Sequence, residues 1–530
     1  MFEKIFSRRD FIKGSAATIF SLAATNFFPI KTQAAETCRI KTRYGIYNGF
    51  VDEKGVQTWL GIPYAKVPVK NLRWRAPEKL EPSDKEFSAK NFGAASMQEQ
   101  YEKSDPLSKQ SENCLTLNIW RRSAKNNQPV MIFIHGGGFV SGGTSDPLYN
   151  GSNLAASHDV IVVTINYRLN IFGFMNFAAI DSDFEDTGYL GIKDQIAALQ
   201  WVKENISEFG GDPDNVTVFG ESAGAMSTMF LMVAPAAKNL FQKAIAQSGH
   251  LAFYYTPEAS AELTEAFMEL GGYKNMQELM KISSSKLIAT YEKLCEERDF
   301  STEIDYLPTC DGKFLPTHPL RALKDGAAQG IKFLTGTTLE EYRYWTLFYG
   351  EELFEHMADF HGILTPVLYE REFTGATEFY QAWQKNYMEI DENERYFEFA
   401  NQLDWRVGQE LMAEYQSAFD DVYFYLFSQK SPIENFGSCH SIDLPFVFNN
   451  PDRYLEPNPS ANLVEQVQAA WVSFATTGNP NNDLISTWKK YSAADRETME
   501  INSEAWTPHK NLNSKNVREL RGIYEDYLLD

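Results

Sequence analysis

The sequence predicts an α/β fold with a mostly parallel central sheet, flanked by helices and carrying helical insertions. Two observations support this prediction. Between residues 129 and 250, short β-rich runs alternate with helical segments, as a parallel sheet with crossover helices requires. Of the 530 residues, 43% are hydrophobic, and no Pro/Gly/Ser-rich linker or internal repeat divides the chain. We therefore expect one large domain over residues 36–530.

Four runs in this region are expected to be buried strands, because they are short and apolar and stand next to turn residues. They are residues 129–134 (PVMIFI), 160–167 (VIVVTINY), 215–219 (NVTVF) and 243–247 (KAIAQ). Between the second and third runs, residues 191–209 carry apolar side chains at helical spacing. This order is typical of a parallel sheet built from crossover units.

The remaining elements extend the sheet and add helices to it. Residues 251–300 are rich in Glu, Lys and Ser at helical spacing, which indicates helices inserted outside the sheet. Strand-like runs return at residues 331–335 and 422–427. A late helix over 463–474 is expected to stop before Gly478 and Pro480, a common pair of helix-ending residues.

Residues 1–35 are predicted to be a twin-arginine export signal. Arg8 and Arg9 stand in SRRDFIK, and an apolar stretch of small residues follows over 14–30. The alternatives are a Sec signal with a chance arginine pair or an ordinary amphipathic helix. The expected location is periplasmic or secreted. No later stretch reaches the ~18 to 20 apolar residues that cross a bilayer, so we expect no stable membrane insertion of the mature chain.

Charge and cysteine content exclude several classes of protein. Asp and Glu outnumber Lys and Arg by 71 to 49, a net charge of -22 that would repel nucleic acid. Five scattered cysteines do not make a disulfide scaffold or a CxxC metal site. Cys295 and Cys310 are the closest pair in sequence and could be bridged, leaving an odd cysteine. No Walker, Rossmann or zinc spacing stands at a convincing place, so neither metal nor cofactor is expected.

The segment 220–224, GESAG, carries the clearest chemical signal. It follows the predicted strand 215–219 and precedes a run that can continue as a helix. Such a tight turn strains the serine backbone and exposes the hydroxyl, so Ser222 is the candidate nucleophile. GxSxG alone arises by chance, and its place between strand and helix makes it specific.

A second motif, HGGGF at 135–139, directly follows the predicted strand 129–134. Consecutive glycines allow main-chain N–H groups to reach a substrate oxygen without obstruction by side chains. Gly137, Gly138 and the N–H of Ala223 are therefore the candidate oxyanion hole. His135 is interpreted as a structural residue of this loop, and a flexible turn is the alternative for the glycines.

These motifs make the chain similar to the type-B carboxylesterase family over about residues 40 to 510. Further segments resemble family signatures: LGIPYA (60–65), SENCLTLN (111–118), NYR (166–168) and FGGDP (209–213). The resemblance implies an α/β-hydrolase fold, a small-molecule ester substrate, and a triad in the order Ser, Asp or Glu, His. Oligomeric state and natural substrate do not follow from it.

The resemblance also assigns the other two members of the triad. GSCHSIDLPFVF at 437–448 is similar to the family's histidine loop, which implies His440 as the general base. GTTLEE at 336–341 resembles the segment that ends in the family's acid, which implies Glu341. The family usually has Gly next, where this chain has Tyr342, so Glu340 stays open as an alternative.

Framework features follow from the same resemblance. Arg73 with Glu112, and Arg168 with Asp194, are expected to be buried structural ion pairs. The family's first disulfide would join Cys114 to an upstream cysteine, and none stands in 93–98, so this bridge is expected to be absent.

Two expectations concern what the chain acts on. Residues 98–113 lack the tryptophan that stacks on choline in cholinesterases, which disfavours choline esters. The acyl and alcohol pockets are expected to be lined by residues of the inserted regions. Their aromatic residues either line these pockets or belong to the ordinary core: Phe253, Tyr254, Tyr255, Tyr344, Trp345 and Phe348.

The sequence therefore predicts an enzyme that hydrolyses carboxylic esters through an acyl-enzyme. Two alternatives stay open: a non-catalytic, neuroligin-like binding protein on the same fold, and a hydrolase of a related carbamate, amide or thioester bond.

Overall fold

The structure of the protein is a computed structural model, and it describes residues 38–99, 103–122, 125–297, 306–345, 376–385, 387–452 and 455–529. The predicted export signal, residues 1–35, and Phe348 lie outside these ranges.

The strands of the described residues form two sheets. They are β1 (Arg39–Thr42), β2 (Gly45–Asn48), β3 (Phe50–Val51), β4 (Gln57–Pro63), β5 (Glu86–Ser88), β6 (Thr116–Arg121), β7 (Gln128–Ile134), β8 (Ile161–Ile165), β9 (Gly211–Glu221), β10 (Lys243–Gln247), β11 (Lys332–Thr338), β12 (Val422–Phe427), β13 (Thr498–Ile501) and β14 (Trp506–His509). Within this part of the chain, the larger sheet has 11 strands in the order β14-β13-β12-β11-β10-β9-β7-β8-β6-β4-β3. Strands β1, β2 and β5 form the smaller sheet.

The centre of the large sheet is parallel and its two edges are antiparallel. From β8 through β7, β9, β10, β11 and β12 to β13, each strand pairs in parallel with its neighbour. Strand β14 pairs antiparallel with β13, and β3, β4 and β6 continue the other edge antiparallel. The mostly parallel sheet predicted from the sequence is confirmed.

Helices cover the sheet and extend beyond it. They are α2 (Ser152–Ser157), α3 (Asn170–Gly173), α4 (Leu190–Asn205), α5 (Ala223–Val233), α6 (Pro257–Gly271), α7 (Met276–Leu279), α8 (Ser284–Glu297), α9 (Pro319–Lys324), α13 (Ala376–Gln384), α14 (Glu392–Ala400), α15 (Val407–Ser417), α16 (Leu444–Phe448), α17 (Ala461–Thr477) and α18 (Ser514–Leu528). A π-helical turn, Asn401–Arg406, joins α14 to α15. Helices α6, α7 and α8 occupy the region predicted to be a helical insertion.

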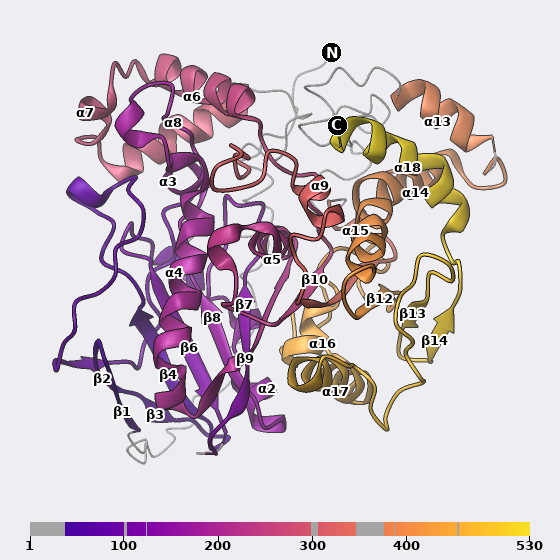
Figure 1. Cartoon of the computed structure of the whole chain (residues 1–530), viewed down its shortest axis with the longest axis horizontal. Helices are drawn as coiled ribbons and strands as arrows, with labels where there is room; N and C mark the ends of the chain where they lie inside the picture. Colours follow the sequence, from indigo (N-terminus) through magenta and orange to yellow (C-terminus); the bar gives the residue numbers. More distant parts are fainter. Residues whose placement is uncertain are drawn as a thin grey trace.

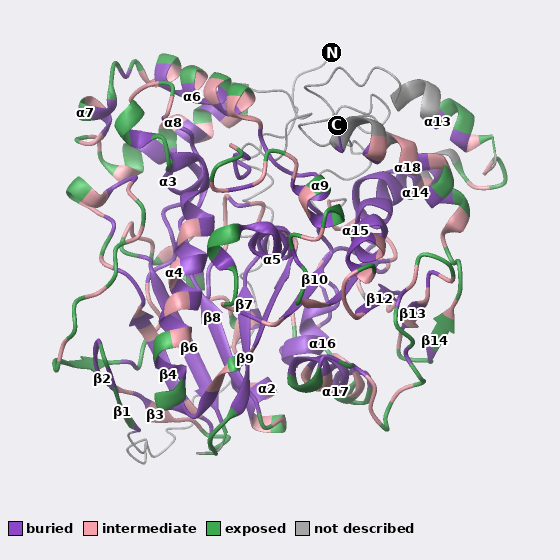
Figure 2. Ribbon diagram, viewed as in Figure 1, coloured by how far each residue is buried: buried purple, intermediate pink, exposed green. Residues whose placement is uncertain are grey.

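The two faces of the sheet belong to two separate apolar clusters, as the alternation of side chains along a strand requires. In β7, Val130, Ile132 and Ile134 join the cluster that contains α4, α5 and α15. Met131 and Phe133 join the other cluster, with α2, α16 and α17. Helices therefore cover both faces (Figure 1), and the central strands are buried along their length (Figure 2).

Differences from the predicted bounds have local causes. The strand expected over 160–167 ends at Ile165, and the next side chain, Asn166, accepts from Thr144 N and donates to Ala94 O. The helix expected over 191–209 ends at Asn205 and continues as a 3₁₀ turn to Phe209, before Gly210 at φ 83°. Strand β11 runs to Thr338, three residues beyond its predicted end, because Thr338 still pairs with Phe427 of β12.

Candidate active site

The candidate nucleophile lies at the turn between β9 and α5. Ser222 has φ 57° and ψ -127°, a strained conformation for a residue with a side chain. A Cβ atom on Gly224 would lie 2.0 Å from the carbonyl oxygen of Ile134, so only glycine fits there against β7. This close packing explains why a small residue follows two positions after the serine, and the strained turn predicted from GxSxG is confirmed.

His440 and Glu341 are brought together from loops that follow neighbouring strands. Glu341 lies three residues beyond β11, and His440 lies in the loop after β12. Nδ1 of His440 is 2.6 Å from Oε2 of Glu341, and both side chains are buried. The main-chain N–H of His440 also donates to the carbonyl oxygen of Glu341, over 3.2 Å.

The carboxylate of Glu341 is fixed by two further donors. Ser248 Oγ and the N–H of Thr338 donate to Oε1 over 2.6 and 2.8 Å, which leaves Oε2 for His440. Ser248 follows β10 directly and was not anticipated from the sequence. Glu340, the alternative acid, accepts instead from Arg343 Nε and from the N–H of Ser438, both over 2.8 Å. The structure thus places Glu341, and not Glu340, against His440.

The other ring nitrogen of His440 faces Glu221. Nε2 lies 3.0 Å from Oε1 of Glu221, close enough for a strong charge interaction. In the described part of the chain no hydrogen bond with acceptable geometry reaches Nε2, from Ser222 or any other residue. Ser441 Oγ donates to the same carboxylate oxygen. Glu221 is the variable residue of the GxSxG motif, and its place at the end of a buried strand was the signal that could have revealed it.

The carboxylates of Glu221 and Glu341 both favour the protonated form of His440. Burial by itself lowers the pKa of His440, but Glu221 and Glu341 on its two sides raise that pKa well above the ordinary value. Asp443, three residues further along, has its pKa raised to about 7 by burial and by the charge of Glu221. Gln247 Nε2 and Tyr425 OH donate to Asp443 and act in the opposite direction. The site therefore holds two buried acids against the imidazole and a third, Asp443, that interacts with the charge of Glu221.

The glycine loop lies directly beside the nucleophile. A Cβ atom on Gly136 would be 3.1 Å from Cβ of Ser222 and 2.9 Å from the carbonyl oxygen of Glu221. Gly137 and Gly138 have φ of 102° and 60°, in the region that favours glycine. Ala223 is the first residue of α5, so its N–H is at a helix N-terminus, where negative charge is favoured. Gly136 and Ala223 thus lie next to Ser222, and the assignment of Gly137, Gly138 and Ala223 as the oxyanion hole stays a prediction.

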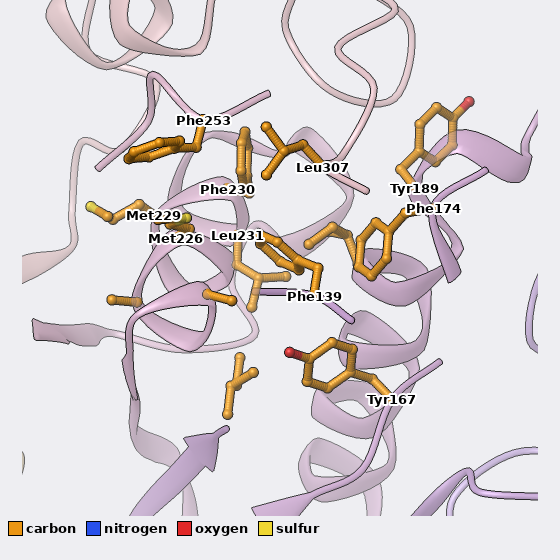
Figure 3. Packing of buried hydrophobic residues seen from close by; sticks show 14 of the residues in the cluster. Phe139, Tyr167, Phe174, Tyr189, Met226, Met229, Phe230, Leu231, Phe253 and Leu307 are labelled. Carbon is orange, nitrogen blue, oxygen red and sulfur yellow. The ribbon is translucent and has the colours of Figure 1, made fainter. Parts of the chain in front are cut away.

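Aromatic packing anchors this loop. Phe139 is fully buried at φ 62°, and its ring contacts Phe174 edge-to-face with centroids 4.9 Å apart (Figure 3). Tyr167 OH donates to the carbonyl oxygen of His135 over 3.0 Å, and the His135 ring stacks on Tyr167. Burial lowers the pKa of His135 to about 4, so it is neutral at neutral pH. These contacts agree with a structural role for His135.

Both predicted ion pairs are present. Arg168 binds Asp194 through two hydrogen bonds of 2.7 Å, and this pair is almost wholly buried. Arg73 binds Glu112 in the same bidentate way and donates to the carbonyl oxygen of Ile282 over 2.7 Å. The second pair therefore ties the inserted helices to the main sheet's loops.

The cysteines do not form the bridge that the sequence left open. Cys310 is a free thiol, fully buried, whose pKa is raised by burial, so a Cys295–Cys310 bridge is not formed. Its main-chain N–H donates to Tyr255 O inside the core, whereas Cys295 is half-exposed on α8. Cys114 is also a free buried thiol, in agreement with the expected absence of the first disulfide.

Three aromatic rings surround His440. The ring centroids of Trp405, Trp345 and Tyr344 lie 4.7, 5.2 and 5.9 Å from that of the imidazole. Tyr344 and Trp345 were expected to line a pocket, whereas Trp405 was not anticipated. Phe253 packs against Trp405 with centroids 6.1 Å apart, while Tyr254 and Tyr255 are buried.

The described residues hold neither a cluster of metal ligands nor a helix suited to crossing a membrane. Among them, no three His, Cys, Asp or Glu side chains are grouped as metal ligands. No helix in the described ranges has the length and apolar character needed to span a membrane.

Comparisons with known proteins agree with this geometry. The model of the carboxylesterase family matches residues 36–519. The para-nitrobenzyl esterase of Bacillus subtilis is 38% identical over 489 residues, covering 88% of this chain and 95% of that protein. The fumonisin B1 esterase of Sphingopyxis macrogoltabida is 32% identical over 503 residues, covering 90% and 88%. A crystal structure of a Geobacillus stearothermophilus carboxylesterase superposes with a TM-score of 0.81 at 33% identity, covering 91% of this chain and 99% of that one.

Proposed function

The chain belongs to the carboxylesterase family and is a carboxylic-ester hydrolase with an α/β-hydrolase fold, and on this premise we propose that it acts through a Ser222–His440–Glu341 triad and an acyl-enzyme intermediate. The observation that carries the proposal is the pair formed by His440 and Glu341, with Nδ1 and Oε2 2.6 Å apart. This contact fixes the tautomer that leaves Nε2 to take a proton.

In the proposed mechanism, Ser222 attacks the ester carbonyl while Nε2 of His440 takes the hydroxyl proton. The N–H groups of Gly137, Gly138 and Ala223 stabilise the oxyanion, and His440 then protonates the departing alcohol. Water attacks the acyl-enzyme by the same route and regenerates the serine. Hydrogen bonds between a nucleophile and its base often tighten only when substrate is bound. The Ser222–His440 bond is proposed to form at that stage, with Nε2 leaving its place beside Glu221.

Ester hydrolysis is favoured over a binding-only role by family membership together with the nucleophile, base, acid and glycines that stand in this chain. The relatives named for para-nitrobenzyl esters and fumonisin B1 suggest small organic esters as the substrate class. Carbamates, amides and thioesters use the same chemistry and are the second class to test.

The test compares the chain with its Ser222→Ala and Ser227→Ala variants on para-nitrophenyl acetate, butyrate and octanoate. Ser227 is the matched control, a buried serine of the same helix whose Oγ accepts from Gln195. We expect activity in the parent and in Ser227→Ala, and a loss of at least about 10³-fold in Ser222→Ala. Equal rates in the parent and Ser222→Ala would remove the serine from its role. A para-nitroanilide in parallel separates esters from amides.

We further propose that residues 1–35 direct export through the twin-arginine route. What supports this is the pair Arg8 and Arg9 ahead of an apolar stretch. Replacing both arginines by lysine should retain the esterase in the cytoplasm of the expressing bacterium. Unchanged export of that double variant would favour the Sec signal instead.

A further inference from the structure

A widened helical turn stands beside the catalytic acid. Residues Asn401–Arg406 form a π-helix between α14 and α15, and all six are buried. The flanking residues Ala400 and Val407 both have right-handed helical backbone, so one continuous helix is widened in its middle. π turns are rare and occur frequently at functional sites. The contacts of this turn indicate its role.

Its polar side chains hold the segment that carries Glu341. Asn401 Oδ1 accepts from the N–H of Tyr342 over 3.0 Å, and Arg406 Nη2 donates to the carbonyl oxygen of Leu339 over 2.9 Å. Tyr342 OH donates to Asp404. Five residues amount to about 1.4 turns of an α-helix, so residues 401 and 406 would face apart there. A π-helix closes i to i+5 bonds and brings them to the same side.

The same turn places Trp405 against the base. The Trp405 ring lies 4.7 Å from the imidazole centroid at an interplanar angle of 47°, and 5.9 Å from Trp345. Trp345 itself lies 5.2 Å from His440. A cation within about 6 Å of an indole centroid is attracted by its electron-rich face, and tryptophan gives the strongest interaction of this kind.

No hydrogen bond of the indole N–H fixes the position of Trp405. Among the described residues no acceptor meets its buried indole N–H. A buried donor without a partner costs stability, and phenylalanine would fill much of the same space without that cost. Buried indoles without an N–H acceptor also occur away from the site, as at Trp59. What distinguishes Trp405 is its contact with His440, with ring centroids 4.7 Å apart.

We propose that Trp405 is a positioning residue for His440: its indole, presented by the π-helical turn, holds the imidazole in place and favours its protonated form. The inference rests on the proposed function, because it concerns the base of that mechanism. The imidazolium exists while the oxyanion is bound, so a ring that favours it lowers the barrier for both acyl transfer steps.

The charged and titratable groups near His440 come from several elements besides the one that carries Trp405. They are Glu341 and Tyr344 after β11, Glu221 at the end of β9, and Cys439 and Asp443 on either side of the histidine. All of them stay in place when only Trp405 is changed.

The experiment measures kcat/KM for para-nitrophenyl butyrate against pH in the parent, Trp405→Phe and Trp405→Leu. Protonation of His440 inactivates the base, so the acidic limb reports its pKa. Loss of the indole should move this limb to lower pH by about half a unit in Trp405→Leu, and by less in Trp405→Phe. The thermal midpoint of Trp405→Phe should stay level or rise, because the unpartnered N–H is gone.

Trp59→Leu is the matched control. Trp59 is also fully buried on β4, its indole N–H meets no acceptor in the described residues, and it packs edge-to-face on Phe209 at 5.1 Å. It should lose stability and keep the parent pH profile. The inference is overturned if the limb of folded Trp405→Leu stays in place, or if Trp59→Leu shifts the limb equally.

A direct titration of His440 measures its pKa even if a variant turns over too slowly for kinetics. ¹⁵N NMR of labelled histidine in the Ser222→Ala background follows the His440 ring with and without Trp405→Leu, and an unchanged titration midpoint also overturns the inference. Failure of the proposed function is a separate result. If Ser222→Ala retains full activity, the triad itself is wrong, whereas an inactive Ser222→Ala with an unmoved limb removes only the role of Trp405.

Discussion

His440 and Glu341 are joined twice, once through their side chains at 2.6 Å and once through the main-chain N–H of His440 to the carbonyl oxygen of Glu341 at 3.2 Å. The second bond aligns the two loops, and the first aligns the ring. The loops that carry His440 and Glu341 therefore stay aligned even if one of the two side chains is altered.

Replacing Glu341 by Gln should keep this main-chain alignment and remove the charge. We expect kcat to fall by about 10³- to 10⁴-fold, because a neutral amide no longer stabilises the imidazolium or fixes the productive tautomer. Steady-state kinetics on para-nitrophenyl butyrate measure this, with KM changing little.

Glu340→Gln is the control for that loss, since Glu340 is the adjacent residue and binds Arg343 and Ser438. It should retain activity within about tenfold of the parent, because the change removes only one hydrogen bond to a charged group. If kcat fell steeply in Glu340→Gln and only slightly in Glu341→Gln, Glu340 would be the acid instead of Glu341.

Replacing Glu221 by Gln tests the unexpected contact at Nε2. The carboxylate of Glu221 raises the pKa of His440, so its removal must lower that pKa. The base then stays unprotonated to a lower pH, and the acidic limb of kcat/KM should move downward. The measurement is a pH profile under conditions where the folded fraction is constant.

Glu500→Gln is the matched change elsewhere in the chain. Glu500 on β13 also pairs with a histidine, with His509 Nε2 2.8 Å from its Oε2. Loss of the Glu500 carboxylate should leave the acidic limb of the kcat/KM profile at the parent pH. An upward shift in Glu221→Gln, or no shift, would contradict the electrostatic account of the site.

Asp194→Ala should destabilise the protein without touching the chemistry. It leaves Arg168, of which 3% of the side chain is exposed, as an unpaired buried charge. Breaking such a pair costs about 3 to 5 kcal/mol in the free energy of unfolding. Urea unfolding measures this, with Asp325→Ala as the exposed comparison. The Arg321–Asp325 pair has side chains 50% and 63% exposed, so its loss should cost about 1 kcal/mol or less.

Much of the framework could be predicted from local sequence. β10 and β12 were predicted with their bounds, and β7 and β9 were found within a few residues, because buried parallel strands are continuous apolar runs. The Ser222 turn is also locally encoded, since the glycines around it are dictated by the backbone of β7. His440 and Glu341 came from resemblance alone. Their separation of 99 residues is invisible to any local pattern.

What the sequence did not reveal depends on contacts between distant segments. Glu221 looks like an ordinary variable residue until β9 is placed beside the loop after β12. The role of Asp443 depends on Gln247 and Tyr425, which lie on other strands. The π turn leaves no periodic trace in NQLDWR, because one widened turn in a helix does not disturb an apolar pattern enough to be recognised.

The contact between Ser441 and Glu221 spans 220 residues, which has a consequence for the order in which the protein becomes active. During synthesis the strained serine turn emerges long before the loop that supplies its base. On the proposed mechanism, a growing chain carries Ser222 without its base, and no acyl transfer to other molecules is expected until the C-terminal third has been made and docked. Esterase activity is accordingly expected to appear late, and the time at which it appears reports when folding of the chain is complete.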